Sequence, residues 1–328
     1  MNRTLYRAAA PAAFVLLALT ACGGANEAEA NGPDAAGATT DGGGEALSGE
    51  VLADGSSTVQ PLTAAAGELF KLENPGVNVS VGTSGTGGGF EVFCQGQTDI
   101  SNASRPIKDE EAQACADAGI EFTELTVATD ALTVVVSAEN DWLQCLTTDE
   151  LATLWGPDAE GTVTTWDQVN PEFPAEPIEL FGPGTDSGTF DYFTDEINGE
   201  EGASRTDYNA SEDDNVLVQG VQGSPNALGY FGFTYFEENA DTLRAVEIDN
   251  GAGCVAPSAE TAADGTYAPL ARPLFVYVNN ASFAEKPAVA EFVKFYATND
   301  GEIAEAAQYI PLNDEAAAEL VAAVEQLG

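Results

Sequence analysis

The chain has 328 residues, of which 54 are Asp or Glu, 10 are Lys or Arg and none is His, so its formal net charge is −44. Such acidity excludes nucleic acid as a partner, because binding to a phosphate backbone needs Lys and Arg, and it argues against docking on anionic lipid headgroups. Because His is absent and no cysteine spacing is typical of zinc, we expect no metal site and no cofactor.

Residues 1–21 have the organisation of a secretory signal peptide. Arg3 and Arg7 precede an apolar run from Ala8 to Leu19, which is followed by small residues. The run is too short to span a bilayer as a mature helix. Leu19-Thr20-Ala21-Cys22 resembles the lipobox of bacterial lipoproteins, which implies that Cys22 is lipidated and becomes the new N-terminus. The alternative is an ordinary secreted protein in which Cys22 has no role.

Residues 22–48 are dominated by Gly, Ala, Asn, Asp and Glu and have no hydrophobic periodicity. Such a segment has few groups to bury, so we expect a flexible tether. A signal peptide, a lipid anchor and a tether together predict an extracytoplasmic protein that is attached to the cell membrane only through the lipid.

The hydrophobic patterns after residue 48 predict strands and helices that alternate along the chain. Strands are expected at Val51–Ala53, Val77–Val81, Ile120–Leu125, Ala131–Val136, Ile178–Phe181, Leu228–Phe233 and Arg272–Val278. Helices are expected at Pro61–Glu73, Phe90–Gly96, Ile107–Ala118, Thr148–Leu154, Thr189–Ile197, Asp213–Val221, Lys286–Thr298 and Asp314–Leu327. This alternation indicates an α/β fold with a mainly parallel sheet.

About 280 residues are too many for one small core and suit two lobes. The two long apolar segments, Ala131–Val136 and Arg272–Val278, are expected to form the hinge between them. We therefore predict one discontinuous lobe from residues 49–130 and 270–328, with a second lobe inserted at 131–269. A ligand is expected in the cleft between the lobes, where its binding would stabilise a closed form.

Four cysteines remain when Cys22 is set aside. An even number of cysteines outside the cytoplasm favours disulfides, and four cysteines allow three pairings. Cys94 and Cys115 are close in sequence, whereas Cys145 and Cys254 are not. We favour the pairs Cys94–Cys115 and Cys145–Cys254, one in each lobe.

Four loops rich in Ser, Thr and Gly carry the main functional signal. They are Asp54–Thr58, Gly82–Gly89, Ser101–Arg105 and Gly182–Thr189. Each offers hydroxyls and exposed backbone N–H groups, and three of them run into a helical pattern. Because a helix N-terminus is a favourable site for an oxyanion, the four loops predict a site that surrounds a small tetrahedral anion.

Particular residues in these loops are candidate anion ligands. Arg105 can make planar, bidentate contact to an oxyanion, although it could instead pair with one of the many acids. The hydroxyls and N–H groups of the other loops could equally be helix caps. The candidates are Ser57, Thr58, Ser84 or Thr86, Arg105, Ser187, Gly188 and Thr189.

Longer motifs around the loops carry a resemblance to a known family. They are GTGGGF at Gly85–Phe90, DISNASRPI at Asp99–Ile107, GPGTDSGTFDYF at Gly182–Phe193 and SEDDNVLVQGV at Ser211–Val221. With these motifs the chain, from about Gly49 to its end, resembles the phosphate-binding proteins of bacterial phosphate ABC importers. The resemblance implies a type II periplasmic-binding-protein fold and a monomeric receptor that captures inorganic phosphate and passes it to a membrane permease.

The chain departs from the family pattern at two positions. Many members have an Arg where this chain has Pro183, and an Asp where it has Arg105. A carboxylate that accepts the proton of hydrogen phosphate rejects sulfate, which has no proton to give. Its replacement is left open among Asp186, Asp54, Asp130 and Asp214, and Asp214 is also a candidate partner for Arg105.

Two other functions remain as alternatives. The loops would also suit a receptor for another tetrahedral oxyanion, such as sulfate or molybdate. A hydrolase with a Ser nucleophile is the alternative of another class. Because the chain has neither His nor a Ser-x-x-Lys pattern to supply a base, we expect no enzyme activity.

Overall fold

The computed structural model describes residues 46–185 and 187–328. The expected signal peptide at 1–21, the lipidation site Cys22, almost all of the tether and the candidate Asp186 therefore lie outside the described residues. Glu45–Gly328 forms one unit by its internal contacts. Within the described part of the chain, no helix is long and apolar enough to cross a membrane.

Among the described residues, nine strands form one sheet in the order β2-β1-β3-β12-β4-β8-β6-β7, with β9 also paired to β4. A second sheet of three strands has the order β11-β10-β5. The strands are β1 Ser48–Gly55, β2 Gly76–Val81, β3 Ile100–Ala103, β4 Phe122–Ser137, β5 Cys145–Thr147, β6 Glu179–Gly182, β7 Asn209–Ala210, β8 Ala227–Gly232, β9 Leu243–Ala245, β10 Glu247–Asp249, β11 Cys254–Val255 and β12 Ala271–Asn279.

The large sheet is mixed, so the prediction of a mainly parallel sheet was wrong for its middle. Pairs at the two ends are parallel: β1 with β2 and β3, and β6 with β7 and β8. In the middle, β12 pairs antiparallel with β3 and β4, and β4 pairs antiparallel with β8 and β9. The physical reason is that β4 and β12 lie side by side in opposite directions in the middle of the sheet, where β12 pairs with β3 on one side and β4 pairs with β8 and β9 on the other.

The prediction of separate strands at Ile120–Leu125 and Ala131–Val136 was also wrong, because both belong to β4, a strand of 16 residues. The polar residues Thr129 and Asp130 interrupt the apolar pattern between them. Both residues have partners in the structure. Thr129 exchanges backbone hydrogen bonds with Ile310, at 3.1 and 3.2 Å, and Asp130 pairs with Arg272. Long-range partners therefore allow polar residues inside a continuous strand.

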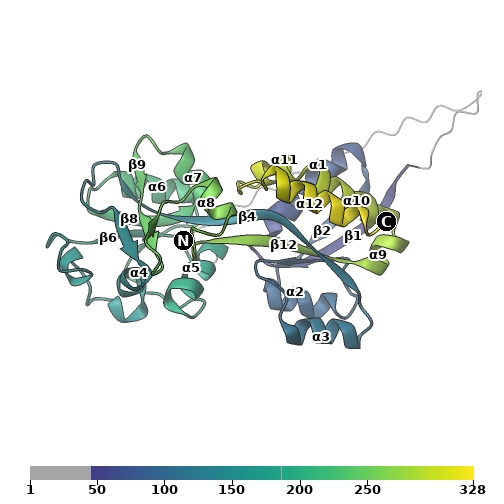
Figure 1. Ribbon diagram of the computed structural model, residues 1–328, viewed down its shortest axis with the longest axis horizontal. Helices are drawn as coiled ribbons and strands as arrows, with labels where there is room; N and C mark the ends of the chain where they lie inside the picture. The colour runs from purple at the N-terminus through teal and green to yellow at the C-terminus, as the bar shows by residue number, and fades with distance from the viewer. Residues whose placement is uncertain (1–45, 186) are drawn as a thin grey trace, which may run out of the picture. The chain divides into compact units, whose positions relative to one another are not determined.

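Helices cover both faces of the sheet around β1. In Figure 1, α1, α10 and α12 gather on one side of the β1–β2 region and α2 and α3 lie on the other. The helices are α1 Gln60–Glu73, α2 Gly85–Phe93, α3 Asp109–Asp117, α4 Thr148–Trp155, α5 Gly188–Asn198, α6 Asp214–Gln222, α7 Phe233–Glu238, α8 Ala259–Ala263, α9 Asn280–Glu285, α10 Pro287–Thr298, α11 Asp300–Ala306 and α12 Asp314–Glu325.

The sequence explains where several helices begin. Pro61 occupies the first turn of α1, where its missing N–H costs nothing, and Leu62, Ala66 and Phe70 recur at four-residue spacing on its buried face. Helix α5 begins after Ser187, whose hydroxyl accepts the N–H of Thr189 at 3.2 Å. Helix α2 begins at Gly85, five residues before the predicted start, so the glycine-rich loop is itself the first turn of a helix.

The buried apolar residues divide into separate clusters. One cluster draws on residues 51–128 and 274–324 and includes Phe70 and Phe292, whereas another draws on residues 132–270 and includes Trp155 and Tyr230. We propose that these clusters are the cores of the predicted lobes, residues 49–130 with 270–328 (lobe 1) and 131–269 (lobe 2). Leu47 also packs against the first cluster, so the fold begins slightly before the predicted end of the tether.

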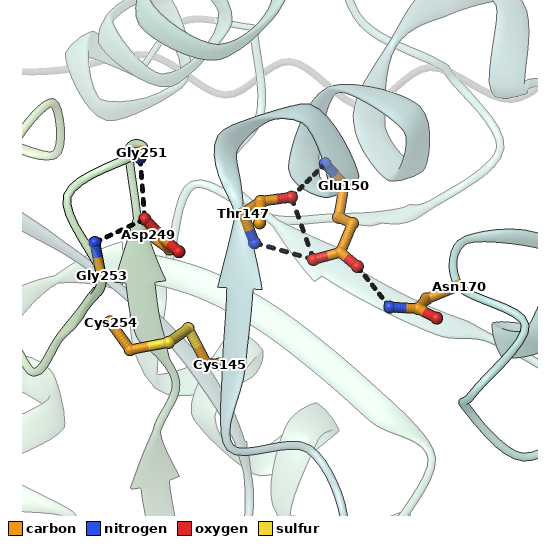
Figure 2. Close-up of a disulfide and its surroundings, with 8 residues drawn as sticks. All are labelled: Cys145, Thr147, Glu150, Asn170, Asp249, Gly251, Gly253 and Cys254. Carbon is orange, nitrogen blue, oxygen red and sulfur yellow. Dashed lines mark hydrogen bonds between the residues drawn. A yellow bond between two sulfur atoms is a disulfide. The ribbon is translucent and has the colours of Figure 1, made fainter.

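Two disulfides join neighbouring elements, with the pairing that we favoured. Cys94–Cys115 connects the end of α2 to α3, and Cys145–Cys254 connects β5 to β11. Figure 2 shows the second disulfide beside the start of α4, where Glu150 accepts hydrogen bonds from Thr147 and from the side chain of Asn170. This disulfide therefore closes the three-stranded sheet within lobe 2.

Candidate functional site

A cavity of about 710 Å³ lies between the two proposed lobes. Its walls come from all four predicted loops and the residues just after the third loop, from helix α5, from Glu201 and from the first half of β12. The lining residues are Ser56, Ser57, Thr58, Gly85, Thr86, Gly87, Ser104, Arg105, Pro106, Lys108, Gly188, Asp191, Tyr192, Asp195, Glu196, Glu201, Arg272 and Pro273.

Three helix N-termini meet at this cavity. Gly85–Gly87 are the first residues of α2, Gly188 is the first residue of α5, and Ser57 and Thr58 stand just before the N-cap of α1. The first N–H groups of an α-helix have no partners within the helix, and the helix dipole adds positive potential there. The cavity is therefore suited to an anion, even though most of its groups carry no formal charge.

Short polar contacts fix the first two loops to each other. Oδ1 of Asp54 accepts the N–H of Gly55 at 2.8 Å and the N–H of Ser84 at 3.0 Å. Gly55 has φ = 137°, and a Cβ there would lie 2.1 Å from the carbonyl oxygen of Asn102, so only glycine fits. Asp54 is thus engaged as a brace between the loops.

The glycine-rich loop is fixed in turn to the loop after β3. The hydroxyls of Thr86 and Ser104 are 3.2 Å apart, and the N–H of Ser104 donates to Oγ1 of Thr86 at 3.3 Å. Both residues line the cavity, whereas Ser84 is the N-cap of α2 and is not among the lining residues. Of the two alternatives in this loop, Thr86 is the residue that faces the cavity.

Arg105 lines the cavity but is held by a carboxylate. Its Nη1 and Nη2 donate to the two oxygens of Glu111 at 2.9 and 2.8 Å, and Nη1 also donates to the carbonyl of Pro106. The hydrogen bond to Glu111 raises the pKa of Arg105. Burial acts to raise the pKa of Glu111, but hydrogen bonds from Arg105 and from the N–H of Lys108 lower it on balance. The partner of Arg105 is therefore Glu111 and not Asp214.

Only one of the three predicted ligand residues after β6 lines the cavity. Gly188 lines the cavity beside Thr58: a Cβ on Gly188 would lie 2.6 Å from Oγ1 of Thr58. Ser187 and Thr189 are not among the lining residues, and the N–H of Thr189 is used by the Ser187 hydroxyl. Two predicted ligand residues, Gly188 of lobe 2 and Thr58 of lobe 1, thus lie beside each other at the cavity.

Sequence reasoning missed Arg272, which lies on the wall of the cavity at the start of β12. Its Nε donates to Oδ2 of Asp130 and its Nη2 to Oγ1 of Thr58, each at 3.3 Å. Its guanidinium carbon lies 3.6 Å from the centre of the Tyr192 ring. The available signal is a lone Arg at the start of the apolar run RPLFVYV, which the hydrophobic pattern predicts as a strand and as part of the hinge.

Comparison with known proteins shows where the chain belongs. The PBP superfamily domain matches residues 34–300. The Phosphate-binding protein PstS of Staphylococcus saprophyticus is 40% identical over 297 residues, which cover 90% of this chain and 86% of that protein. The chain belongs to the PstS-like members of the PBP superfamily. Protein SphX of Synechocystis sp. is 51% identical over 266 residues, 81% of this chain and 79% of its own length.

A solved structure has the same fold. The crystal structure of a possible phosphate binding protein from Planctomyces limnophilus matches with a TM-score of 0.80 at 43% identity, covering 86% of this chain and 99% of that one. Together with the family match, this confirms the predicted α/β periplasmic-binding-protein fold and the resemblance on which it was based.

In this PstS-like chain, acids share the cavity with bases. Arg105, Lys108 and Arg272 come from lobe 1 and β12, whereas Asp191, Asp195, Glu196 and Glu201 come from lobe 2. Burial and a neighbouring acid raise the pKa of Asp191 and of Glu196, and Arg272 opposes both shifts. The side of the cavity formed by lobe 1 and β12 is therefore the more favourable for an anion.

Asp214, a candidate proton acceptor, does not line the cavity of this PstS-like chain. It is the first residue of α6, and burial, together with the charges of Asp213 and Glu212, raises its pKa to about 6. The raised value means that the charged form is less stable in the folded protein than in the unfolded chain.

Replacing Asp214 with Asn should therefore stabilise the protein at pH 8 and not at acid pH. The folded protein takes up the Asp214 proton near pH 6 and the unfolded chain near pH 4, so the penalty is complete above pH 6 and disappears below pH 4. We expect the variant to gain about 1–3 kcal/mol in the free energy of unfolding at pH 8. Urea unfolding at pH 8 and pH 4 measures this, and an equal gain at both pH values would contradict it.

Proposed function

We propose that this chain captures inorganic phosphate in the cavity between its lobes and delivers it to the membrane permease of an ABC importer. The observation that carries the proposal is the meeting of three helix N-termini and several hydroxyls at one cavity. Relatives with 35–40% identity over most of the chain are named phosphate-binding proteins, which supports phosphate among the tetrahedral oxyanions.

The ligand set that we propose follows the cavity wall. The hydroxyls of Ser57, Thr58 and Thr86 and the N–H group of Gly188 are direct ligands, because these residues line the cavity. Ser187 supports them as the cap of α5. Ser84, Thr189, Arg105, Asp186 and Asp214 stay predictions from the sequence.

A local site is needed because the whole chain repels an anion. The formal net charge is −44, and salt screens charges that are separated by more than about 8 Å at physiological ionic strength. Helix dipoles and hydrogen bonds act at shorter range, where solvent and salt screen them least. We infer that phosphate is attracted by the cavity itself and not by the field of the protein.

Capture by lobe closure follows from the contacts between the lobes. Gly188 of α5 lies beside Thr58, just before α1, and the hydroxyl of Tyr235 in α7 donates to Oε1 of Gln308, just after α11, at 2.9 Å. A phosphate bound between Thr58 and Gly188 would contact both lobes at once. It would therefore favour the arrangement in which the two lobes are close.

The setting of the protein follows from its N-terminal sequence. We propose that residues 1–21 direct export, that Cys22 carries a lipid and that residues 22–48 link the lipid to the folded unit. The protein would then work as a monomeric receptor outside the cytoplasm, next to its permease. We propose binding and no catalysis, because the chain contains no His to activate a Ser nucleophile.

The proposal is tested by thermal unfolding of protein stripped of bound anion, with phosphate, sulfate or molybdate added at constant ionic strength. Phosphate at 100 times its dissociation constant should add about 2.7 kcal/mol of stability, which raises Tm by several degrees. Equal rises with sulfate or molybdate would favour a general oxyanion receptor. The absence of a rise with any of the three anions would contradict the proposed function.

A further inference from the structure

We propose that Arg272, and not Arg105, is the main cationic ligand of the bound anion, and that Asp130 and Tyr192 position it. The inference rests on the proposed function of the cavity. It assigns the charge contact to a residue outside the four loops, on strand β12 of lobe 1.

The hydrogen bonds of the two arginines differ in strength and number. Arg105 is bound by Glu111 through two hydrogen bonds of 2.8 and 2.9 Å, which are ordinary distances for a charged pair. Arg272 makes two bonds of 3.3 Å, which are long for N–H donors. Among the described residues, Nη1 of Arg272 has no hydrogen-bond partner. Of the five N–H donors of a guanidinium group, Arg272 uses two on described residues and has three left for an anion, whereas Arg105 uses three, two of them on Glu111, and has two left.

The surroundings of Arg272 hold its guanidinium group in the cavity wall. Its guanidinium carbon lies 3.6 Å from the centre of the Tyr192 ring, and the Tyr192 hydroxyl donates to the carbonyl of Pro269, which fixes that ring. Asp130 lies opposite Arg272 in the register of β4 and β12 and accepts a hydrogen bond from its Nε. Asp130 holds one edge of the guanidinium group and the Tyr192 ring covers one face, so the protein and not the solvent directs the remaining N–H donors.

Arg272 also adjoins the proposed hydroxyl ligand of the first loop. Its Nη2 donates to Oγ1 of Thr58. The same oxygen is the nearest heavy atom, at 2.6 Å, to the position that a Cβ on Gly188 would occupy. An anion that accepts from Thr58 and from the N–H of Gly188 therefore lies next to Arg272. Since Tyr192 belongs to lobe 2 and Thr58 to lobe 1, Arg272 contacts both lobes at the same point.

The test compares phosphate dissociation constants of purified wild-type protein and variants by equilibrium dialysis. Arg272→Gln alone would leave the buried Asp130 without a partner, so the main variant is the double change Asp130→Asn with Arg272→Gln. Loss of charged hydrogen bonds should weaken phosphate binding by about 10- to 100-fold. Arg272→Lys, which keeps the charge and loses the planar fork, should weaken it several-fold.

Two comparisons complete the test. Lys294→Gln removes one positive charge from an exposed pair with Glu291 and should leave the dissociation constant within about twofold of wild type. Arg105→Gln should cost less affinity than the change at Arg272. Melting curves without phosphate establish that each variant is folded. If the double variant is not folded, the dissociation constant of Arg272→Lys tests the assignment instead.

The outcomes separate this inference from the proposed function. If the wild-type protein binds phosphate and the folded double variant, or Arg272→Lys where the double variant does not fold, binds it equally well, the assignment of Arg272 is wrong and the proposed function stands. A larger loss at Arg105 than at Arg272 would also overturn the assignment. If the wild-type protein binds no phosphate, the proposed function and the assignment fail together.

Discussion

Replacing Gly188 with Ala should weaken phosphate binding by about 5- to 150-fold while the protein stays folded. The new Cβ would lie 2.6 Å from Oγ1 of Thr58, 3.4 Å from the Thr58 nitrogen and 3.5 Å from Oγ of Ser57. Either the proposed ligand Thr58 is displaced or the two lobes cannot approach as closely. The dissociation constant, measured by equilibrium dialysis, checks this prediction.

Gly301→Ala is the matched control for this substitution. Gly301 lies in α11, and a Cβ there would meet no atom within 4 Å. The same chemical change should therefore leave phosphate binding unaltered and stabilise the helix slightly. An unchanged phosphate affinity in Gly188→Ala would contradict the proposal that Thr58 and Gly188 form part of the phosphate site.

Removing the disulfide Cys145–Cys254 with two Ala substitutions should lower the free energy of unfolding by about 2–5 kcal/mol. The bridge closes a loop with a sequence separation of 109, so it restricts the unfolded chain more than the bridge Cys94–Cys115, which has a separation of 21. Because stabilisation by a crosslink rises with the length of the closed loop, the long loop predicts the larger effect. Urea unfolding of the oxidised proteins measures it.

Phosphate affinity separates this loss of stability from damage to the site. The disulfide joins β5 and β11 in the three-stranded sheet (Figure 2). Neither cysteine lines the cavity. The double variant should therefore bind phosphate with an affinity close to that of wild type below its unfolding transition. A urea midpoint equal to that of wild type would contradict the predicted role of the bridge.

Local patterns in the sequence were enough to predict most of the elements around the site. The apolar spacing of Leu62, Ala66 and Phe70 places α1 correctly to within a residue, and the cap Ser187 marks the start of α5. The glycines at 85–89 hid the start of α2, because glycine is a poor helix former. Their small size lets the helix approach β1: a Cβ on Gly89 would lie 2.5 Å from the Cα of Gly55.

Arg105 was predicted at the site, but its ion pair and that of Arg272 were not, and for Arg272 the reason is that its partner is distant in sequence. Arg272 and Asp130 are brought together by the register of β4 and β12, at a separation of 142 residues. Among 54 acids, nothing in the composition marks Glu111 as the partner of Arg105. A local clue did exist, since Glu111 lies three residues after the N-cap Lys108 of α3, the position from which a side chain returns to cap the helix.

The most direct test of the account is equilibrium dialysis of radiolabelled phosphate against the purified protein, stripped of bound anion, with sulfate as competitor at constant ionic strength. We predict saturable binding of one phosphate per chain that survives an equal concentration of sulfate. Binding that does not saturate, or that equimolar sulfate abolishes, would contradict the claim that this cavity is a phosphate receptor site.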